Sequence, residues 1–392
     1  MPDEQIINTG LRGVTIASTK ISDVDGSVGK LVYRGYLAKD LAGKSTFEEI
    51  AYLLIFEKLP QKEALKEFSH QVFKESFLPD ELIAALKTRP KNALPMDILQ
   101  SAVSMLAHHD SDIETATKEV STKMAIRLIA KVSCIVAAWE RIRNGQEPVK
   151  ASSDLNLAGN FLYMMFGEKP DAEMISFMDA ALVLHAEHSF NASTFAAREV
   201  ASTRAHMYAA VSAAVGSLSG ALHGGANTRV MLMLMKIGSA DNVDGYVEKE
   251  LAEGRKVMGL GHAVYKVDDP RALILAPMSK RMGEMKGDTS WYDMSVKLEK
   301  SAKEAFKKQK NVDIFVNVDY YSASLYYSMG IPMDQFTPVF AVSRIAGWVA
   351  HVIEEQFATA APQPVLYRPE SEYIGEYCGP NVCKYEDIDE RD

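Results

Sequence analysis

Apolar residues recur at intervals of three and four positions along most of this chain, the spacing of one face of an α-helix. One clear start is Ser45-Thr-Phe-Glu48, which has the spacing of a capping box and is followed by apolar residues up to Leu54. Similar stripes predict helices over about 96–107, 121–143, 171–188, 193–218 and 338–356. Strand-like alternation is confined to 12–17, 30–34 and Ile314-Phe-Val316. The pattern therefore predicts an all-α fold.

The composition of the sequence differs between about 222 and 332 from that of the rest of the chain. This block contains the glycine turns His223-Gly-Gly225 and Gly259-Leu-Gly261, and then a lysine-rich stretch from Lys300 to Lys310. We interpret residues 222–332 as a smaller domain inserted into a large helical domain formed by 1–221 and 333–392. The chain returns to the large domain through a helix predicted to begin at Thr337-Pro338, an N-cap followed by proline.

Composition narrows the class of protein. The 392 residues are 47% apolar and 24% charged, which fits a globular protein with a sizeable core. The net charge of -9 gives no global attraction to nucleic acid or to an anionic membrane, so a local cationic cluster must hold any anionic substrate. The start of the chain has no basic patch followed by an apolar run, and no uninterrupted apolar stretch reaches ~18 residues. We therefore expect a cytoplasmic protein with no membrane span.

Three cysteines are present. Cys134 lies in an apolar helical pattern and is interpreted as a buried small hydrophobic residue. Cys378 and Cys383 flank Gly-Pro-Asn-Val, where they could form a small-loop disulfide or half of a metal site. We expect two free thiols, because the predicted compartment is reducing and no second pair of ligands is visible nearby.

Two segments place histidines where burial or a tight turn is expected. His185 falls on the core side of the helix predicted over 171–188, and His188 follows near its end. Both could be core histidines with satisfied hydrogen bonds, or functional ones. His223 precedes two glycines in Leu222-His-Gly-Gly-Ala-Asn227, where the missing side chains allow a ligand to approach or simply permit a tight turn.

Three further residues carry the same ambiguity. His262 leaves a glycine turn, and Arg271 follows it nine residues later behind a proline, so the segment is either a surface loop or part of a site. Asp319 opens a helix that is predicted to end at Gly330, and it could be the N-cap of that helix. Arg344 shares a stripe with Ile345 and Trp348, where an arginine either extends to solvent or meets a buried anion.

These motifs, in this order, resemble those of the citrate synthase family. The matching elements are Leu-His-Gly-Gly-Ala-Asn227, Gly-Leu-Gly-His-Ala-Val-Tyr265, Asp-Pro-Arg271, Asn-Val-Asp319 and Val-Ser-Arg344. The resemblance extends from about Gly10-Leu-Arg-Gly-Val to Tyr367-Arg-Pro-Glu370. It implies a citrate synthase-like fold, a homodimer and an acyltransferase of the tricarboxylic acid cycle that condenses acetyl-CoA with oxaloacetate.

The resemblance also implies residue roles. Asp319 would be the general base that removes a methyl proton from acetyl-CoA, His223 would hydrogen-bond the thioester oxygen, and His262 would supply a proton to the keto oxygen of oxaloacetate. His188, Arg271 and Arg344 would hold oxaloacetate. Arg368 matches an arginine that is contributed to the neighbouring subunit's site.

Coenzyme A contacts are expected along the glycine turn and at nearby polar residues. The candidates are Lys256, Val257, Met258, Gly259, Leu260, Gly261, Lys310 and Asn317. Coenzyme A would act as a substrate, and an acid–base set of one aspartate and two histidines needs no prosthetic group and no metal. If oxaloacetate draws the small domain shut, the acetyl-CoA pocket forms only when the acceptor is present.

Two rival functions remain. The related 2-methylcitrate synthases use propionyl-CoA and tend to have tyrosine where this chain has His185, while Ala263 and Asn-Val-Asp319 also favour citrate synthase. The segment Ser189-Phe-Asn-Ala-Ser-Thr194 is shared by both groups, so dual activity is an alternative. A non-catalytic helical interaction protein is disfavoured, because every expected catalytic position is occupied.

Overall fold

The computed structural model describes residues 8–391 apart from 12, 263, 376, 378 and 380–384. The described part contains sixteen α-helices and one small sheet, which confirms the all-α prediction. Cys134 is buried, as predicted. The predictions for Cys378, Cys383 and Ala263 lie outside the described residues.

The sheet is an antiparallel meander of three short strands in the order β1-β2-β3. The strands are β1 (Ser22–Asp25), β2 (Lys30–Tyr33) and β3 (Tyr36–Leu37). Its register pairs Ser22 with Tyr33 and Val32 with Leu37. The prediction near 30–34 is thus confirmed. The one for 12–17 is wrong, because the described residues there have no partner strand, and Val316 forms only a single bridge with Leu260.

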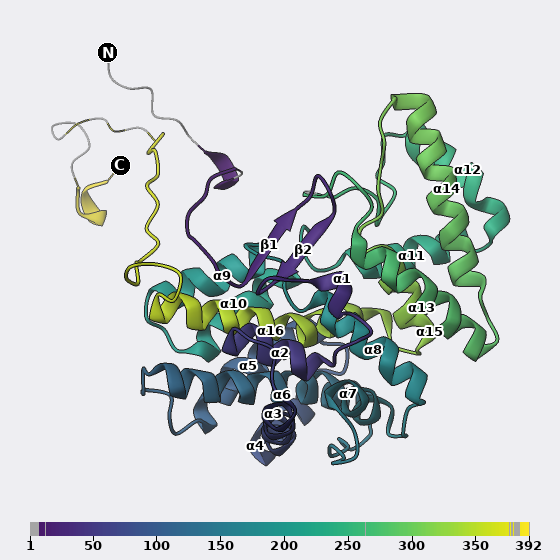
Figure 1. The fold of residues 1–392 in the computed structure, drawn as a ribbon. Coiled ribbons are helices and arrows are strands. Elements are labelled where there is room, and N and C mark those ends of the chain that lie inside the picture. The colour runs from purple at the N-terminus through teal and green to yellow at the C-terminus, as the bar shows by residue number, and fades with distance from the viewer. Residues whose placement is uncertain are drawn as a thin grey trace.

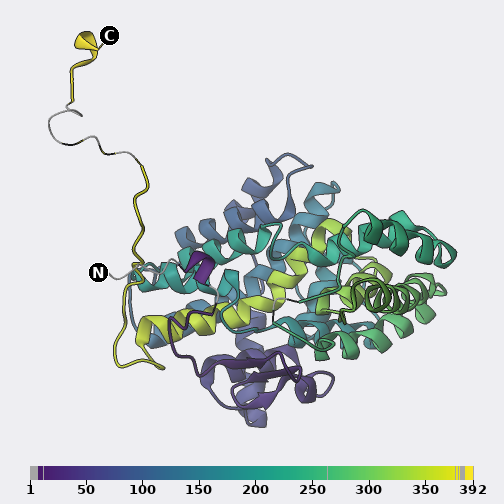
Figure 2. The same cartoon turned by 90° about the horizontal axis from the view of Figure 1, so that it is seen from above.

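Most helices form one large body that surrounds a central helix (Figures 1 and 2). The surrounding helices are α1 (Ala38–Leu41), α2 (Phe47–Phe56), α3 (Lys62–Glu75), α4 (Asp80–Lys87), α5 (Pro95–Leu106), α6 (Lys118–Arg143), α7 (Leu157–Phe166), α8 (Ala172–His185), α9 (Ala192–Ser202) and α10 (Met207–Ser219). The central helix is α16 (Phe336–Phe357). It is long and apolar enough to cross a membrane, but its apolar window is entirely buried among the other helices. A helix with this much apolar surface is stable where other helices cover it.

The structure corrects three helix boundaries. The stripe over 193–218 is two helices, because the chain turns after Ser202 and the side chain of His206 caps α10. The N-cap of α2 is Thr46, which accepts a hydrogen bond from the backbone N–H of Glu49, so the capping box begins one residue later than predicted. Helix α16 begins at Phe336, directly after the 3₁₀ turn Met333–Gln335, and not at the predicted N-cap Thr337.

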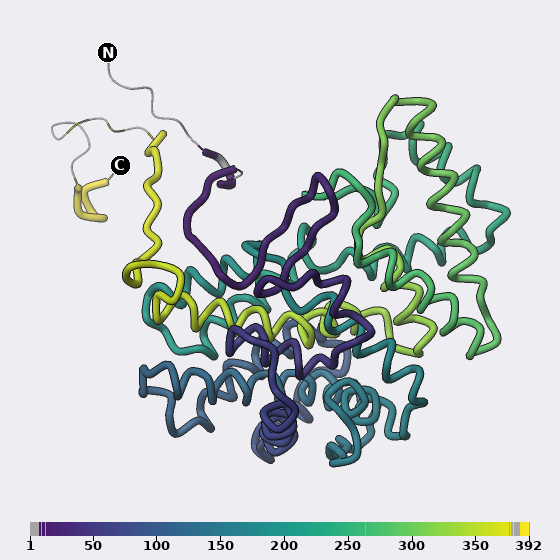
Figure 3. Tube along the Cα trace, in the orientation of Figure 1, coloured from purple at the N-terminus to yellow at the C-terminus, as the bar shows by residue number. Residues whose placement is uncertain are grey.

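Five helices between residues 226 and 328 pack mainly on one another and lie to one side of the large body (Figure 1). They are α11 (Ala226–Ile237), α12 (Val243–Ala252), α13 (Pro270–Lys286), α14 (Ser290–Lys310) and α15 (Val318–Ser328). This grouping lies within the predicted inserted block, although the division into two domains stays a prediction. After α16 the chain leads away from the helical body (Figure 3).

Helix α16 comes unusually close to the end of α8 at Gly347. The backbone N–H of Gly347 donates to the carbonyl of Ala186 at 3.1 Å. A Cβ at Gly347 would lie 2.2 Å from Oε2 of Glu187 and 2.5 Å from the Ala186 carbonyl. The absence of a side chain therefore sets the distance between α16 and the segment that follows α8.

We expect Gly347→Ala to lower the free energy of unfolding by ~1–3 kcal/mol, because the added methyl group has no space. The matched control is Gly245→Ala in α12, where an added Cβ meets nothing within 4 Å. That control should raise stability by up to ~1 kcal/mol, since alanine favours helices over glycine. Urea unfolding of both variants measures the difference, and equal effects would contradict the proposed crowding at Gly347.

Candidate active site

A cavity of about 680 Å³ is lined by residues from several separate segments of the chain. The predicted catalytic and oxaloacetate-binding residues that line it are His188, His223, His262, Arg271, Asp319 and Arg344. The structure thus brings together all three predicted catalytic residues and three of the four predicted for oxaloacetate. Because such a cluster of ionisable groups in one concavity is typical of functional sites, this cavity is the candidate active site.

Backbone pairing fixes the segment before His262 against the segment before Asp319. The N–H of Gly261 donates to the carbonyl of Phe315 at 2.7 Å, and the N–H of Asn317 donates to the carbonyl of Gly259 at 3.0 Å. The side-chain amide of Asn317 also donates to the carbonyl of Gly261 at 3.1 Å. These three bonds hold the two loops in one register, so they set the position of His262 relative to Asp319.

Asp319 is free for chemistry because another residue caps its helix. The side chain of Asn317 accepts the N–H of Asp319 at 3.1 Å, which makes Asn317 the N-cap of α15. The interpretation of Asp319 as the N-cap is therefore wrong, and α15 ends at Ser328, two residues before Gly330. Burial raises the pKa of Asp319 to about 6, although Arg271 works in the opposite direction.

His223 is oriented by the start of α9. The backbone N–H of Ser193 donates to Nε2 of His223 at 3.2 Å, so in the neutral ring the proton is carried by Nδ1. The hydroxyl of Ser193 lies 2.8 Å from the same nitrogen and accepts from the indole N–H of Trp348 at 3.1 Å. Burial, followed by the charge of Arg344, lowers the pKa of His223 to about 4, which keeps the ring neutral.

Of the two interpretations of the glycines beside His223, the structure supports the tight turn at Gly224. A Cβ at Gly224 would lie 2.3 Å from the carbonyl of Leu218, and the N–H of Gly224 donates to that carbonyl at 3.0 Å. Gly224 therefore permits a tight turn at the end of α10. The guanidinium of Arg229 lies over Gly225, since a Cβ there would be 3.2 Å from Nη1.

His262 has the opposite tautomer from His223. Its Nδ1 accepts the backbone N–H groups of Val264 at 2.9 Å and Tyr265 at 3.1 Å, so the proton of the neutral ring is on Nε2. Burial, followed by Arg271, lowers the pKa of His262 to about 4. The ring centroid of His188 is 5.6 Å away, and Nε2 of His188 lies 3.2 Å from the hydroxyl of Tyr265. Burial and Arg271 hold the pKa of His188 well below its ordinary value.

Two of the arginines that line the cavity, Arg271 and Arg344, are buried cations. Arg271 is 3% exposed and forms a bidentate pair with Asp269, with bonds of 3.0 and 2.7 Å. Arg344 is 1% exposed, and its Nε donates to the carbonyl of His185 at 2.7 Å. Arg344 does not reach solvent, and burial lowers its pKa to about 10. A buried guanidinium with so little compensation favours binding of an anion.

His185 lies behind the cavity wall. Its side chain is fully buried, and Nδ1 donates to the carbonyl of Ala181 at 2.8 Å, while Nε2 has no hydrogen-bond partner among the described residues. Burial lowers the pKa of His185 to about 3. Its ring packs edge-on against Phe340, which lines the cavity, with centroids 5.0 Å apart. His185 is thus a core histidine next to the site, with one of its nitrogens unsatisfied.

Some predicted residues lie outside the cavity. Lys256 and Lys310 are exposed and do not line it, whereas Gly261 and Asn317 do. Gly259 has a φ of +76°, and a Cβ there would lie 2.7 Å from Tyr320, so this glycine is needed for packing. Arg368 is exposed and does not line the cavity of its own chain. Val257, Met258 and Leu260 are partly or fully buried and are also absent from the lining.

The sequence interpretation missed several lining residues, of which Arg229 and Phe340 change the chemistry most. Arg229 follows Ala226 by three residues, which places both on one face of α11, and this helical spacing was the available signal. Its positive charge lowers the pKa of Asp319. Phe340 precedes Arg344 by four residues on α16, and the guanidinium carbon of Arg344 lies 4.7 Å from the centre of its ring.

Comparison with known proteins agrees with this geometry. A family model described as "Citrate synthase, C-terminal domain" matches residues 10–370. The chain belongs to the citrate synthase family. It is 42% identical to citrate synthase 2 of Bacillus subtilis over 97% of this chain and 98% of that one. It is also 38% identical to a 2-methylcitrate synthase of Mycobacterium tuberculosis over 94% of this chain and 91% of that one.

The fold is shared with solved members of the family. A citrate synthase from Thermoplasma acidophilum, in ternary complex with carboxymethyl coenzyme A and oxaloacetate, superposes with a TM-score of 0.89 at 31% identity. The alignment covers 98% of this chain and 100% of the other. Family membership makes this protein an acyltransferase, and citrate synthases use oxaloacetate and acetyl-CoA.

We expect the raised pKa of Asp319 to make the stability of the fold depend on pH. Because the folded-state value of about 6 exceeds the ordinary value of 3.8, the stabilisation belongs to the protonated form. It is complete below pH 3.8 and is lost as the pH rises through 6. The variant Asp319→Asn does not titrate, so it should gain ~1–3 kcal/mol of unfolding free energy relative to wild type between pH 4.5 and pH 7.

Urea unfolding at both pH values tests this expectation, with Asp154→Asn, an exposed aspartate, as the control for net charge. The control should show the same difference from wild type at both pH values. If Asp319→Asn behaves like this control, the proposed burial of the carboxylate is wrong.

Proposed function

We propose that this enzyme is a citrate synthase that condenses acetyl-CoA with oxaloacetate and water to give citrate and CoA. The observation that carries the proposal is the shared cavity, in which Asp319 faces two neutral imidazoles and two buried guanidinium groups. Each class of group has a distinct task in the reaction.

The first step needs a base and an oxyanion donor together. A thioester methyl group is a very weak acid, so its proton leaves only if the developing enolate oxygen is stabilised at the same time. Asp319, with a pKa of about 6, is a stronger base than an ordinary aspartate. Because Nε2 of His223 accepts from Ser193, its Nδ1–H is the donor for the thioester oxygen.

The second step forms the carbon–carbon bond. The enolate carbon attacks the keto carbon of oxaloacetate, and the keto oxygen takes a proton from Nε2 of His262, whose Nδ1 is occupied by backbone donors. Arg271, Arg344 and His188 hold the two carboxylates, since guanidinium groups match carboxylates with paired hydrogen bonds and stay charged without water. Water then cleaves the thioester of the product, which releases citrate and CoA.

Coenzyme A would bind as a substrate without a prosthetic group or metal. The backbone of residues 257–261 would lie along its pantetheine arm, with Gly261 and Asn317 at the cavity, and the exposed Lys256 and Lys310 would contact its phosphates. Closure of the inserted block over oxaloacetate, and a cytoplasmic location, belong to the same proposal.

The dimer completes the site in this proposal. Tyr367 is anchored to the body of its own chain, because its hydroxyl donates to Glu355 at 2.8 Å and its N–H to Ser202 at 3.2 Å. The next residue, Arg368, is exposed and lies outside the cavity of its own chain. An anchored arginine in this position is available to the site of a second subunit, where it would add a cation to Arg229, Arg271 and Arg344.

The second candidate function is 2-methylcitrate synthesis from propionyl-CoA, which the similarity to a 2-methylcitrate synthase keeps open. We favour acetyl-CoA because position 185 is histidine, and this ring supports the cavity wall through Phe340.

Thiol release with oxaloacetate and either acetyl-CoA or propionyl-CoA tests the substrate. We expect kcat/KM to be higher with acetyl-CoA, and Asp319→Asn to lower kcat by ~10²–10⁴-fold, as the loss of a general base does. A preference for propionyl-CoA would identify the second candidate instead. An unchanged rate in Asp319→Asn would show that another group is the base.

Mixed dimers test the role of Arg368. In a dimer with one Asp319→Asn and one Arg368→Ala subunit, one of the two sites would have both residues intact, so we expect about half of the wild-type activity. Each variant alone should be nearly inactive. A mixed dimer no more active than its parents would contradict a shared site.

A further inference from the structure

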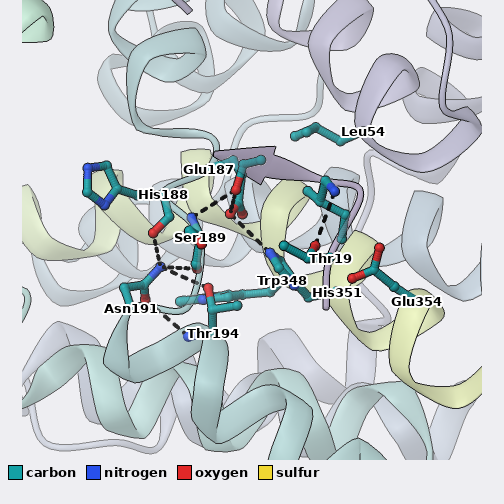
Figure 4. Close-up of polar contacts among 12 residues, drawn as sticks. Thr19, Leu54, Glu187, His188, Ser189, Asn191, Thr194, Trp348, His351 and Glu354 are labelled. Atoms are coloured by element: carbon teal, nitrogen blue, oxygen red, sulfur yellow. Dashed lines mark hydrogen bonds and ion pairs between the residues drawn. The ribbon is translucent and has the colours of Figure 1, made fainter. Parts of the chain in front are cut away.

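The turn that presents His188 to the cavity contains a strained residue. Ser189 has a φ of +51°, in the left-handed region that non-glycine residues rarely adopt. Such a residue costs ~1–3 kcal/mol and persists only when its surroundings hold it. Its backbone N–H donates to the hydroxyl of Ser22 at 3.0 Å, from the beginning of β1. Figure 4 shows the His188 ring on one side of this turn and a buried polar cluster on the other.

Glu187 is the centre of that cluster. Its side chain is fully buried, and Oε1 accepts from the hydroxyl of Ser22 at 2.9 Å and from Nε2 of His351 at 3.0 Å (Figure 4). Burial alone would raise the pKa of Glu187, but His351 and Arg344 lower it below its ordinary value, so the group is a carboxylate. A buried carboxylate is tolerated only while such partners remain in place.

The hydrogen bonds of the cluster have only one possible direction. Arg198 can only donate, and its Nη1 lies 2.9 Å from Nδ1 of His351, so that nitrogen is the acceptor. The ring proton of His351 is therefore on Nε2, which donates to Glu187. The hydroxyl of Ser22 donates to Glu187 and accepts from Ser189. Because the donor and the acceptor of each hydrogen bond in this series are fixed, the bonds form in only one arrangement, and this arrangement holds the turn in one geometry.

Arg198, at the other end of this series of hydrogen bonds, is also held in place. Arg198 is 3% exposed and donates to Glu354 at 2.8 Å, and its Nη2 lies 2.6 Å from Glu355. Helix α16 supplies both ends of the arrangement, because Arg344, Gly347 and His351 lie at intervals that share one helical face. Arg344 faces the cavity, Gly347 allows the close approach to Glu187, and His351 holds Glu187.

We infer that Ser22, Glu187 and His351 are positioning residues for oxaloacetate binding, which hold the strained turn so that His188 faces the substrate. None of the three lines the cavity, so they act through the turn. The inference rests on the proposed function, in which His188 contacts oxaloacetate. It predicts that breaking these hydrogen bonds weakens the binding of oxaloacetate selectively and has little effect on the binding of acetyl-CoA.

Two pairs of variants make the test specific. Ser22→Ala removes the hydroxyl that joins Glu187 to Ser189, and its control is Ser133→Ala, a buried serine in α6 whose hydroxyl donates to Ala130 at 2.7 Å. His351→Asn keeps an acceptor near Arg198 but loses the donor to Glu187. His351→Gln reaches Glu187 with its amide N–H but gives up the bond to Arg198. Each histidine variant loses one hydrogen bond, so their stabilities should be similar.

We expect the KM for oxaloacetate to rise ~10–100-fold in Ser22→Ala and His351→Asn, the range that loss of supporting residues produces. His351→Gln and Ser133→Ala should stay within about twofold of wild type, as should the KM for acetyl-CoA in all four. Calorimetric titration with oxaloacetate alone measures its Kd without turnover. The Kd should rise in the same variants in which the KM for oxaloacetate rises.

Wild-type values for oxaloacetate in both Ser22→Ala and His351→Asn would overturn the inference, as would equal losses in His351→Asn and His351→Gln, the result of a purely structural role. If His351→Asn does not fold, the comparison of Ser22→Ala with Ser133→Ala still tests the inference. Absence of condensation by the wild-type enzyme would instead refute the proposed function, so the two failures are distinguishable.

Discussion

The chemistry of this protein depends on keeping water away from ionisable side chains around one cavity. Loss of solvation penalises the charged form of every group, so it raises the pKa of Asp319 and lowers those of His223, His262 and Arg344. The result is a stronger base, two neutral hydrogen-bond donors and a cation that favours an anionic ligand. In water the same residues would have their ordinary pKa values, which is why the packing of the surrounding helices matters to the proposed reaction.

That packing comes mainly from α16, which runs through the large body and contributes Phe340 and Arg344 to the cavity wall. Gly347 lets this helix approach the residues after α8, and Trp348 donates to Ser193, which in turn fixes His223. His262 and Asp319 are held differently, by backbone bonds between residues 259–261 and 315–317. One side of the site is therefore set by helix packing, and the other by a short extended pairing.

The buried cluster around Glu187 shows how strain and charge can support each other. The left-handed Ser189 is unfavourable by itself, and a buried carboxylate is unfavourable by itself. The hydroxyl of Ser22 joins the two, because it donates to Glu187 and accepts the backbone N–H of Ser189. Because that serine begins β1, the small sheet is joined directly to the turn that carries His188.

The sequence by itself determined the all-α class and the family, because helical spacing and ordered motifs are local signals. Six of the seven residues that it predicted to bind oxaloacetate or act on the substrates lie together in one cavity. It could not determine that Asn317 caps α15 in place of Asp319, or that the helix over 193–218 is broken, since both depend on which competing local hydrogen bond is formed. The tautomer of His223, the closeness of Gly347 to Glu187 and the entry of Arg229 into the cavity wall were decided only by tertiary structure. Each results from contact between segments far apart in the chain, and burial, which sets the pKa values, exists only once those segments have packed.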